Sequence, residues 1–243
     1  MTQIKIILIL FLTIISCNEK SNKIDFSETD ISVTEIETTS EMETDNSTPK
    51  SYLALGDSYT IGQSVPEKDR FPVQLVNDLN TKNYNFNAPK IIAQTGWTTG
   101  ELKNAILQEN ISEKYDLVTL LIGVNNQFRG NSIDVFRTEF IELLNLAITF
   151  SGNNPENIIV ISIPDWGVSP YAAGEDKDKI SKEIDIFNTI KKEETLKMNI
   201  KFVDITTISR QALNKNQYFA SDGLHFSGEM HQLWVDEIIN NFN

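Results

Sequence analysis

Five short apolar segments alternate with longer amphipathic segments, and this alternation limits the folds that the chain can adopt. Each apolar segment is rich in β-branched or other apolar residues and is bounded by Gly, Pro, Asp or Asn, as strands are. The expected strands are "SYLAL" (51–55), "KIIAQ" (90–94), "LVTLLIG" (117–123), "NIIVISI" (157–163) and "KFVDI" (201–205). The expected helices span about 67–80, 98–110, 132–150, 176–198 and 227–242. Such an alternation predicts an α/β fold with a parallel sheet covered on both faces.

Glycine and polar residues follow each expected strand. They are Gly56-Asp57-Ser58, Thr95-Gly96-Trp97, Gly123-Val124-Asn125-Asn126, Pro164-Asp165-Trp166 and, after the last strand, Asp222-Gly223-Leu224-His225. In an open parallel sheet, sites form beyond the carboxyl ends of the strands. We therefore expect these residues to meet at one edge of the sheet.

The first residues have the pattern of an export signal. Residues 1–16 contain Lys5 and the apolar run "IILILFLTII", which is too short to span a bilayer as a helix. The run leads into "IISC", which resembles the lipobox of bacterial lipoproteins and ends at Cys17, the only cysteine of the chain. An ordinary signal peptide with a chance cysteine is the alternative. The resemblance implies secretion and a membrane anchor on Cys17, placing the protein in the periplasm or on the cell surface.

Residues 17–50 have the composition of a disordered tether. Positions 18–50 carry nine Asp or Glu against three Lys, many Ser and Thr, and no sustained apolar period. We expect the folded domain to cover residues 51–243. The net charge of −13 argues against nucleic acid or an anionic membrane surface as an electrostatic partner.

The stretch "SYLALGDSYTIGQS" (51–64) has two interpretations. A P-loop needs a lysine after its second glycine, and a dinucleotide fingerprint needs Gly-x-Gly-x-x-Gly; neither is present. A flavodoxin-type phosphate loop stays open, although Asp57 would repel a phosphate. The other interpretation makes Ser58 a nucleophile, which requires an oriented base.

The chain has two histidines that could be this base. His231 falls inside the last expected helix, where we expect surface or half-buried packing. His225 lies in a loop three residues after Asp222, whose carboxylate could orient one imidazole nitrogen and leave the other for Ser58. Asp-x-x-His alone is a weak signal, because many such tetrads are helix caps.

Four blocks in order resemble the SGNH (GDSL-type) hydrolases. They are "ALGDSYTIG", the glycine after the second strand, "IGVNN" and "SDGLHFS", and together they span the chain from Ser51 to about Asn243. The resemblance implies a three-layer α/β/α sandwich around a flavodoxin-like parallel sheet of about five strands. It also favours the nucleophile interpretation of the first loop.

The resemblance implies a role for each matched residue. Ser58 would be the nucleophile, His225 the general base and Asp222 its orienting carboxylate. The oxyanion hole would combine the N–H groups of Ser58 and Gly96 with the side-chain amide of Asn125. Asp57 is expected to be structural, accepting loop amides. Two residues depart from the pattern: Tyr59 replaces a leucine, and Asn126 stands where an aspartate is usual, which puts the hydrogen bonding of that loop in doubt.

These residues predict a serine esterase that works through an acyl-enzyme without metal or organic cofactor. Trp97, Phe128 and Trp166 are candidates for substrate contacts, although packing is the commoner role of such side chains. We expect short acyl or acetyl esters, including esters on carbohydrate, as substrates. The alternatives are a lysophospholipase or thioesterase, an acyltransferase with the same residues, and a binding lipoprotein without catalysis.

Overall fold

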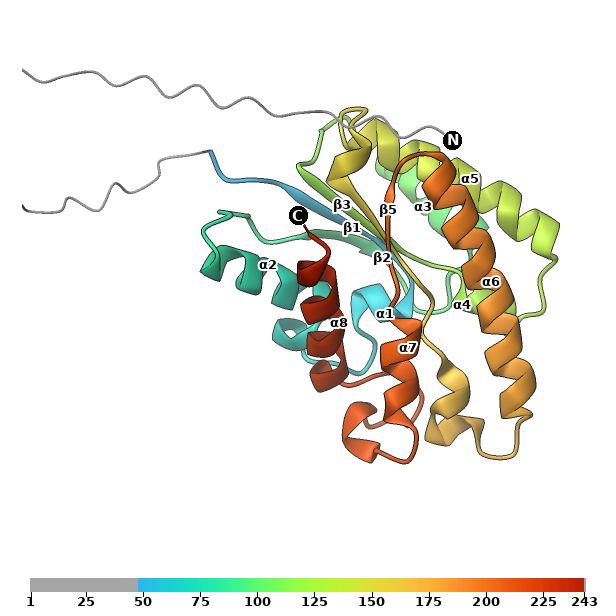
Figure 1. Cartoon of the computed structure of the whole chain (residues 1–243). Helices are drawn as coiled ribbons and strands as arrows, with labels where there is room; N and C mark the ends of the chain where they lie inside the picture. Colours follow the sequence, from blue (N-terminus) through green and yellow to red (C-terminus); the bar gives the residue numbers. More distant parts are fainter. Residues whose placement is uncertain (1–47, 243) are drawn as a thin grey trace, which may run out of the picture. The chain divides into compact units, whose positions relative to one another are not determined.

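The computed structural model describes residues 48–242, which fold around one parallel sheet (Figure 1). Its strands are β1 (Tyr52–Gly56), β2 (Lys90–Ala93), β3 (Leu117–Leu121), β4 (Ile158–Ile161) and β5 (Lys201–Val203). Their order in the sheet is β2-β1-β3-β4-β5, and all four neighbouring pairs are parallel. This is the flavodoxin-like order, so the predicted fold class is confirmed.

Helices cover both faces of the sheet. The longer ones are α2 (Phe71–Thr81), α3 (Thr99–Glu109), α5 (Ile133–Phe150), α6 (Lys177–Lys197) and α8 (Gly228–Asn240). Helices α2 and α8 pack together on one face, while α3, α5 and α6 lie side by side on the other (Figure 1). Three short helices, α1 (Ser58–Ile61), α4 (Val124–Phe128) and α7 (Thr206–Ser209), follow strands β1, β3 and β5.

The core lies between the sheet and these helices. Every residue of β1, β3 and β4 is buried, which explains why these strands are almost continuously apolar rather than alternating. Helix α5 turns an apolar stripe inward at Phe136, Phe140, Leu143, Leu144 and Ala147. A polar pair also lies in the core, where the hydroxyls of Tyr52 and Thr119 are 2.8 Å apart and satisfy each other.

Most element boundaries lie within two residues of the prediction. The start of α2 differs more, because residues 67–69 form a separate 3₁₀ turn and the α-helix begins at Phe71. The short helices α1, α4 and α7 were not expected; each is only four or five residues long, too short for a periodic pattern. Helix α3 begins with a capping box, in which Thr98 Oγ1 accepts the N–H of Glu101 and Glu101 Oε2 accepts the N–H of Thr98 at 2.8 Å.

The predicted signal peptide, Cys17 and most of the tether lie outside the described residues. Within residues 48–242, no helix is both long and apolar enough to cross a membrane.

Candidate active site

Ser58 lies at the start of α1, directly beyond the carboxyl end of β1. A Cβ atom on Gly56 would come within 2.4 Å of the Leu121 carbonyl oxygen, so only glycine permits the close approach of this strand end to β3. Asp57 caps α1 by accepting the N–H of Tyr59 at 3.1 Å. The sequence therefore makes a tight strand-to-helix turn that holds Ser58 at the edge of the sheet.

Asp57 is buried within this turn, with 1% of its surface exposed. Burial raises its pKa to about 7, against the effect of the Tyr59 amide and of the nearby Lys191 ammonium. Lys191 of α6 is also fully buried and donates to the carbonyls of Ile122 and Ile161, both at 2.8 Å. This lysine ties together the carboxyl ends of β3 and β4, next to the loops that carry the candidate site.

Asp222 and His225 form a hydrogen-bonded pair in the loop before α8. His225 Nδ1 lies 2.7 Å from Asp222 Oδ2, and Asp222 Oδ1 accepts the N–H groups of Leu224 and His225 at 2.9 Å. The two ends of the loop are joined by an antiparallel bridge between Phe219 and Phe226. Partial burial raises the pKa of Asp222, but hydrogen bonds from Ser64, Leu224 and His225 outweigh it and hold the pKa below its ordinary value.

The second histidine has a structural position, and our expectation of surface or half-buried packing for it was wrong. His231 is 1% exposed, stacks on Trp234 with ring centroids 4.6 Å apart, and accepts the N–H of Phe71 at 3.1 Å. Phe71 is the first residue of α2, whose preceding residue Arg70 provides no side-chain cap. His231 therefore satisfies an amide at the start of α2 from α8, and burial lowers its pKa to about 3, which keeps the ring neutral.

The loops after β2 and β3 are joined by asparagine amides. Gly96 has φ = 90°, a left-handed conformation that favours glycine, and its carbonyl accepts Arg129 Nη2 at 2.6 Å. Asn125 Nδ2 donates to the carbonyl of Trp97 at 2.9 Å, so one of its two amide hydrogens bonds the neighbouring loop. Asn126 is buried and bonds both the N–H and the hydroxyl of Thr99.

A small cavity of about 80 Å³ opens between these loops. Its walls are formed by Ser58, Tyr59, Val124, Asn125, Phe128, Trp166, Leu224 and His225. The structure thus brings Ser58, Asn125 and His225 to one cavity, together with two of the three aromatic residues predicted to contact substrate. Trp97 and Gly96 are not among the walls; Trp97 is partly buried and packs against the core.

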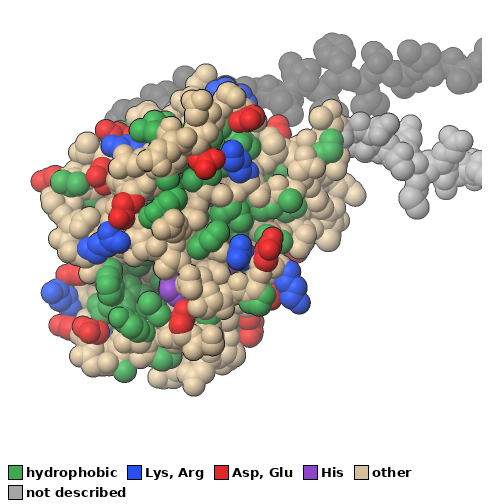
Figure 2. Space-filling view, turned by 180° about the vertical axis from the view of Figure 1, so that it is seen from behind, with side chains coloured by type: hydrophobic (Ala, Val, Ile, Leu, Met, Phe, Trp, Pro, Cys, Tyr) green, Lys and Arg blue, Asp and Glu red, His purple; other side chains and the backbone are tan. Residues whose placement is uncertain are grey.

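A larger groove of about 410 Å³ adjoins this cavity and shares Phe128 and Trp166 with it. The rings of Phe128 and Tyr171 are about half exposed, at 52% and 53%, and both pack edge-on against Trp166. The groove's other walls include three carboxylates and one ammonium, from Glu175, Asp176, Glu183 and Lys179. Figure 2 shows hydrophobic side chains gathered beside a histidine on one face of the molecule, with charged side chains around them.

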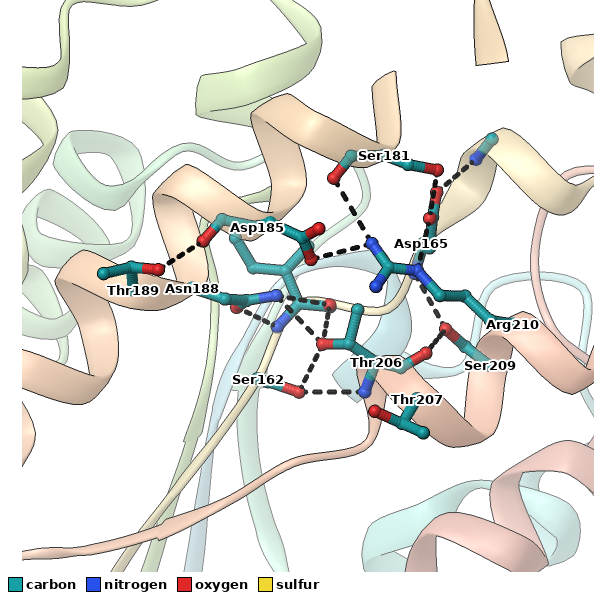
Figure 3. A network of polar contacts seen from close by, with 12 residues as sticks. Ser162, Asp165, Ser181, Asp185, Asn188, Thr189, Thr206, Thr207, Ser209 and Arg210 are labelled. Atoms are coloured by element: carbon teal, nitrogen blue, oxygen red, sulfur yellow. Dashed lines mark hydrogen bonds and ion pairs between the residues drawn. The ribbon is translucent and has the colours of Figure 1, made fainter. Parts of the chain in front are cut away.

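Asp165, which precedes Trp166, is part of a polar network (Figure 3). This carboxylate is fully buried, accepts Arg210 Nε at 2.9 Å and Ser181 Oγ at 2.6 Å, and caps the 3₁₀ turn Trp166–Val168 through the N–H of Gly167. The indole N–H of Trp166 donates to Gln127 at 2.8 Å. These bonds fix the aromatic wall of the cavity from both α6 and the segment after α7.

Several residues around the site were not singled out from the sequence. Lys191 had a readable signal, because it stands four residues after Phe187 and seven after Ile184, on the buried stripe of α6. Tyr59 was noted only as a replacement of the usual leucine; it packs edge-on against His225 with ring centroids 5.9 Å apart, and nothing in its sequence position indicates this contact. Ser64, which donates to Asp222 Oδ2 at 2.7 Å, has no local signal either.

A serine, a histidine with a carboxylate partner, and an asparagine amide at the strand ends of a parallel sheet define a site of the serine-hydrolase type. The GDSL-like lipase/acylhydrolase family matches the chain over residues 54–233, and the chain belongs to that family. It is accordingly a carboxylic ester hydrolase, as the four sequence blocks predicted.

Solved structures support the fold. TesA is 14% identical with a TM-score of 0.63, over 80% of this chain and 98% of its own. The esterase EstA from Pseudoalteromonas sp. is 17% identical with a TM-score of 0.56, over 79% and 95%. Axe2, an acetylxylan esterase from Geobacillus stearothermophilus, is 17% identical with a TM-score of 0.62, over 80% and 94%. At these identities the likeness concerns the fold, and no curated protein matches the chain in sequence.

Proposed function

We propose that the protein hydrolyses short acyl esters through an acyl-enzyme on Ser58. The observation that carries this proposal is the shared cavity, in which Ser58 and His225 face the same space while His225 Nδ1 bonds Asp222. A carboxylate only accepts, so its bond assigns the Nδ1 proton to the imidazole and leaves Nε2 as the base for the serine hydroxyl.

The reaction then follows from these groups. Ser58 Oγ attacks the ester carbonyl as its proton passes to His225 Nε2, and the imidazolium is stabilised by Asp222. Collapse of the tetrahedral intermediate breaks the bond to the alcohol, which leaves with that proton. Water repeats the sequence on the acyl-enzyme, releasing the acid and restoring the serine hydroxyl.

The developing oxyanion needs donors that are already in place. The proposed donors are the N–H groups of Ser58 and Gly96 and the second amide hydrogen of Asn125. The bond from Asn125 to the Trp97 carbonyl supports this role, because it fixes the amide plane before substrate binds. Each donor in such a hole is typically worth about 10²–10³ in rate.

The cavity volume favours a short acyl group. About 80 Å³ corresponds to the space of two or three water molecules, which suits an acetyl group, whereas a long chain would have to extend out of the cavity. The groove beside it offers two exposed aromatic faces and carboxylate acceptors, a combination that suits the apolar faces and hydroxyls of a sugar ring. We therefore propose acetyl or similarly short esters on carbohydrate; Axe2, a structural neighbour, is an acetylxylan esterase.

The first test is hydrolysis of p-nitrophenyl esters from acetyl to palmitoyl by the wild type and by Ser58→Ala. We expect turnover that is highest for acetyl, and loss of both turnover and fluorophosphonate labelling in the folded variant. Labelling that survives in Ser58→Ala would move the nucleophile elsewhere. A profile that peaks at long chains would favour the lysophospholipase or thioesterase alternative.

The groove has its own test. Tyr171→Ala should raise KM for an acetylated sugar several-fold and leave KM for p-nitrophenyl acetate unchanged, because the smaller ester does not reach the groove. Leu107→Ala is the matched control, since Leu107 is also exposed but lies on α3. Equal effects of Tyr171→Ala on both substrates would contradict a sugar subsite.

We further propose that the enzyme is exported and anchored through a lipid on Cys17. The support is the sequence "IISC" after an apolar run, in a chain with no other cysteine. Growth of cells with a labelled fatty acid should label the wild type and not Cys17→Ser. Label that persists in Cys17→Ser would refute the anchor and leave the esterase proposal intact.

A further inference from the structure

The Asp222 carboxylate has a hydrogen-bond partner outside the Ser-His-Asp set. The Ser64 hydroxyl donates to Oδ2 at 2.7 Å, the same oxygen that His225 Nδ1 contacts at 2.7 Å. Oδ1 is already bonded by two backbone N–H groups of its own loop. Four donors thus surround the carboxylate, and the Ser64 hydroxyl is the one that comes from a different part of the fold.

Ser64 adopts an unusual backbone conformation to make this contact. Its φ is 62°, in the left-handed region that side chains other than Gly, Asn and Asp rarely adopt. The preceding turn is closed by bonds from the N–H groups of Gly62 and Gln63 to the carbonyl of Ser58. The strained residue therefore follows directly from the turn that carries Ser58, and it faces Asp222 across 158 positions of sequence. Such strain persists where surrounding contacts hold it, often at functional sites.

A chain of hydrogen bonds also runs in one direction from Thr95 through Ser64 to Asp222. Thr95 Oγ1 donates to Gln63 Oε1 at 2.6 Å, and Gln63 Nε2 makes a long contact of 3.5 Å to Ser64 Oγ. The Ser64 proton then points to Asp222. Thr95 precedes Gly96, so the chain connects the loop of a proposed oxyanion donor with the carboxylate that orients His225.

We propose that Ser64 is a positioning residue, whose hydroxyl holds the Asp222 carboxylate in the orientation that presents His225 Nε2 to Ser58. This inference rests on the proposed acyl-enzyme mechanism. Without the hydroxyl, the carboxylate keeps its bonds within its own loop but loses its hydrogen bond to the turn that carries Ser58. The imidazole then samples orientations that do not reach the serine.

Two other titratable side chains face the His225–Asp222 pair, and neither titrates near neutrality. Tyr59 of α1 packs edge-on against His225, and burial raises its pKa well above the ordinary value. His231 of α8 is near enough for its charge to interact with that of His225, and burial lowers its pKa to about 3. A change in the pH at which the rate falls on the acidic side of the pH–rate profile (the acidic limb) therefore reports on the His225–Asp222 pair.

The test compares Ser64→Gly and Ser64→Ala with the wild type. Glycine removes the hydroxyl and relieves the left-handed conformation, so this variant should unfold at an unchanged urea midpoint. We expect kcat for p-nitrophenyl acetate and the rate constant of fluorophosphonate labelling to fall about tenfold in both variants, with KM unchanged. The acidic limb should move to higher pH, because an Asp222 oxygen that has lost one donor attracts the imidazolium more strongly.

Asn153→Gly is the matched control, because Asn153 has φ = 65° in an exposed turn before β4. It should match the wild type in every measurement. Ser64 variants with wild-type kcat and pH profile, alongside a Ser58→Ala variant that is not labelled, would overturn the role of Ser64 and leave the mechanism standing. A wild type that fluorophosphonate does not label would overturn the mechanism and this inference with it. If kcat falls only in variants whose urea midpoint also falls, Ser64 has a structural role alone, and the proposal is overturned.

Discussion

Changing Asn126 to the aspartate that is usual in this family should destabilise this protein. Asn126 is fully buried; its Oδ1 accepts the N–H of Thr99 at 3.0 Å and its Nδ2 donates to the Thr99 hydroxyl at 2.8 Å. The single proton of that hydroxyl is donated to Glu139. In Asn126→Asp, an ionised carboxylate would face the hydroxyl oxygen with no proton between them and with a second carboxylate close by.

The loss in free energy of unfolding cannot exceed the cost of protonating the new carboxylate. A buried charge without a partner costs about 3–5 kcal/mol, but a carboxyl can instead take up a proton and donate it to the Thr99 hydroxyl. An ordinary aspartate has a pKa of about 3.9, so protonation costs at most about 1.5 kcal/mol at pH 5 and about 4 kcal/mol at pH 7. The new group has a folded-state pKa above its unfolded value. Stability is therefore retained below about pH 4 and lost as the pH rises.

Urea unfolding at pH 5 and pH 7 measures this difference. We expect Asn126→Asp to lose no more than about 1.5 kcal/mol relative to the wild type at pH 5 and about 3–4 kcal/mol at pH 7. Asn145→Asp, at an exposed position of α5, should change stability by less than about 0.5 kcal/mol at either pH. An Asn126→Asp variant with the same small loss at both pH values would refute the network as described.

Two further substitutions test the supports of the site. Lys191→Met removes two bonds to buried carbonyls and should cost about 2–4 kcal/mol in urea unfolding. Its neighbour Lys192 is exposed, so Lys192→Met should unfold like the wild type; equal stability of the two variants would refute the buried role. Asp165→Asn turns an amide toward the donors Arg210 and Ser181, should cost about 2 kcal/mol, and should broaden the acyl-length profile as Trp166 loosens. Asp185→Asn is the control, because Asp185 is an exposed partner of Arg210. An unchanged acyl-length profile in Asp165→Asn would show that this network does not position Trp166.

The fold could be predicted because its signals are local and repeated. Apolar runs mark β1, β3 and β4 because these strands are buried on both faces, and the amphipathic period marks α5 and α6. Residues directly after each strand share one edge of any parallel sheet, so the meeting of Ser58 and Asn125 follows from the strand positions. His225 stands far beyond the end of β5, just before α8, and its place at the site came from the family resemblance. Strand order does not follow from the strand positions either, because it depends on which helix crosses which face, and it came from the family resemblance.

The roles of the two histidines show why the rest was not readable. His225 and His231 are the same residue type six positions apart, and one lines a cavity while the other is 1% exposed in the core. His231 is buried because α8 packs on α2 and because the first amide of α2 needs an acceptor at that point. The α8 sequence gives no sign of this acceptor role, because the amide that needs it belongs to Phe71 of α2. The same holds for Ser64 and Asp222: a hydroxyl donor becomes part of a site only when the fold brings its acceptor within reach, and contacts of this kind decide function where periodicity decides architecture.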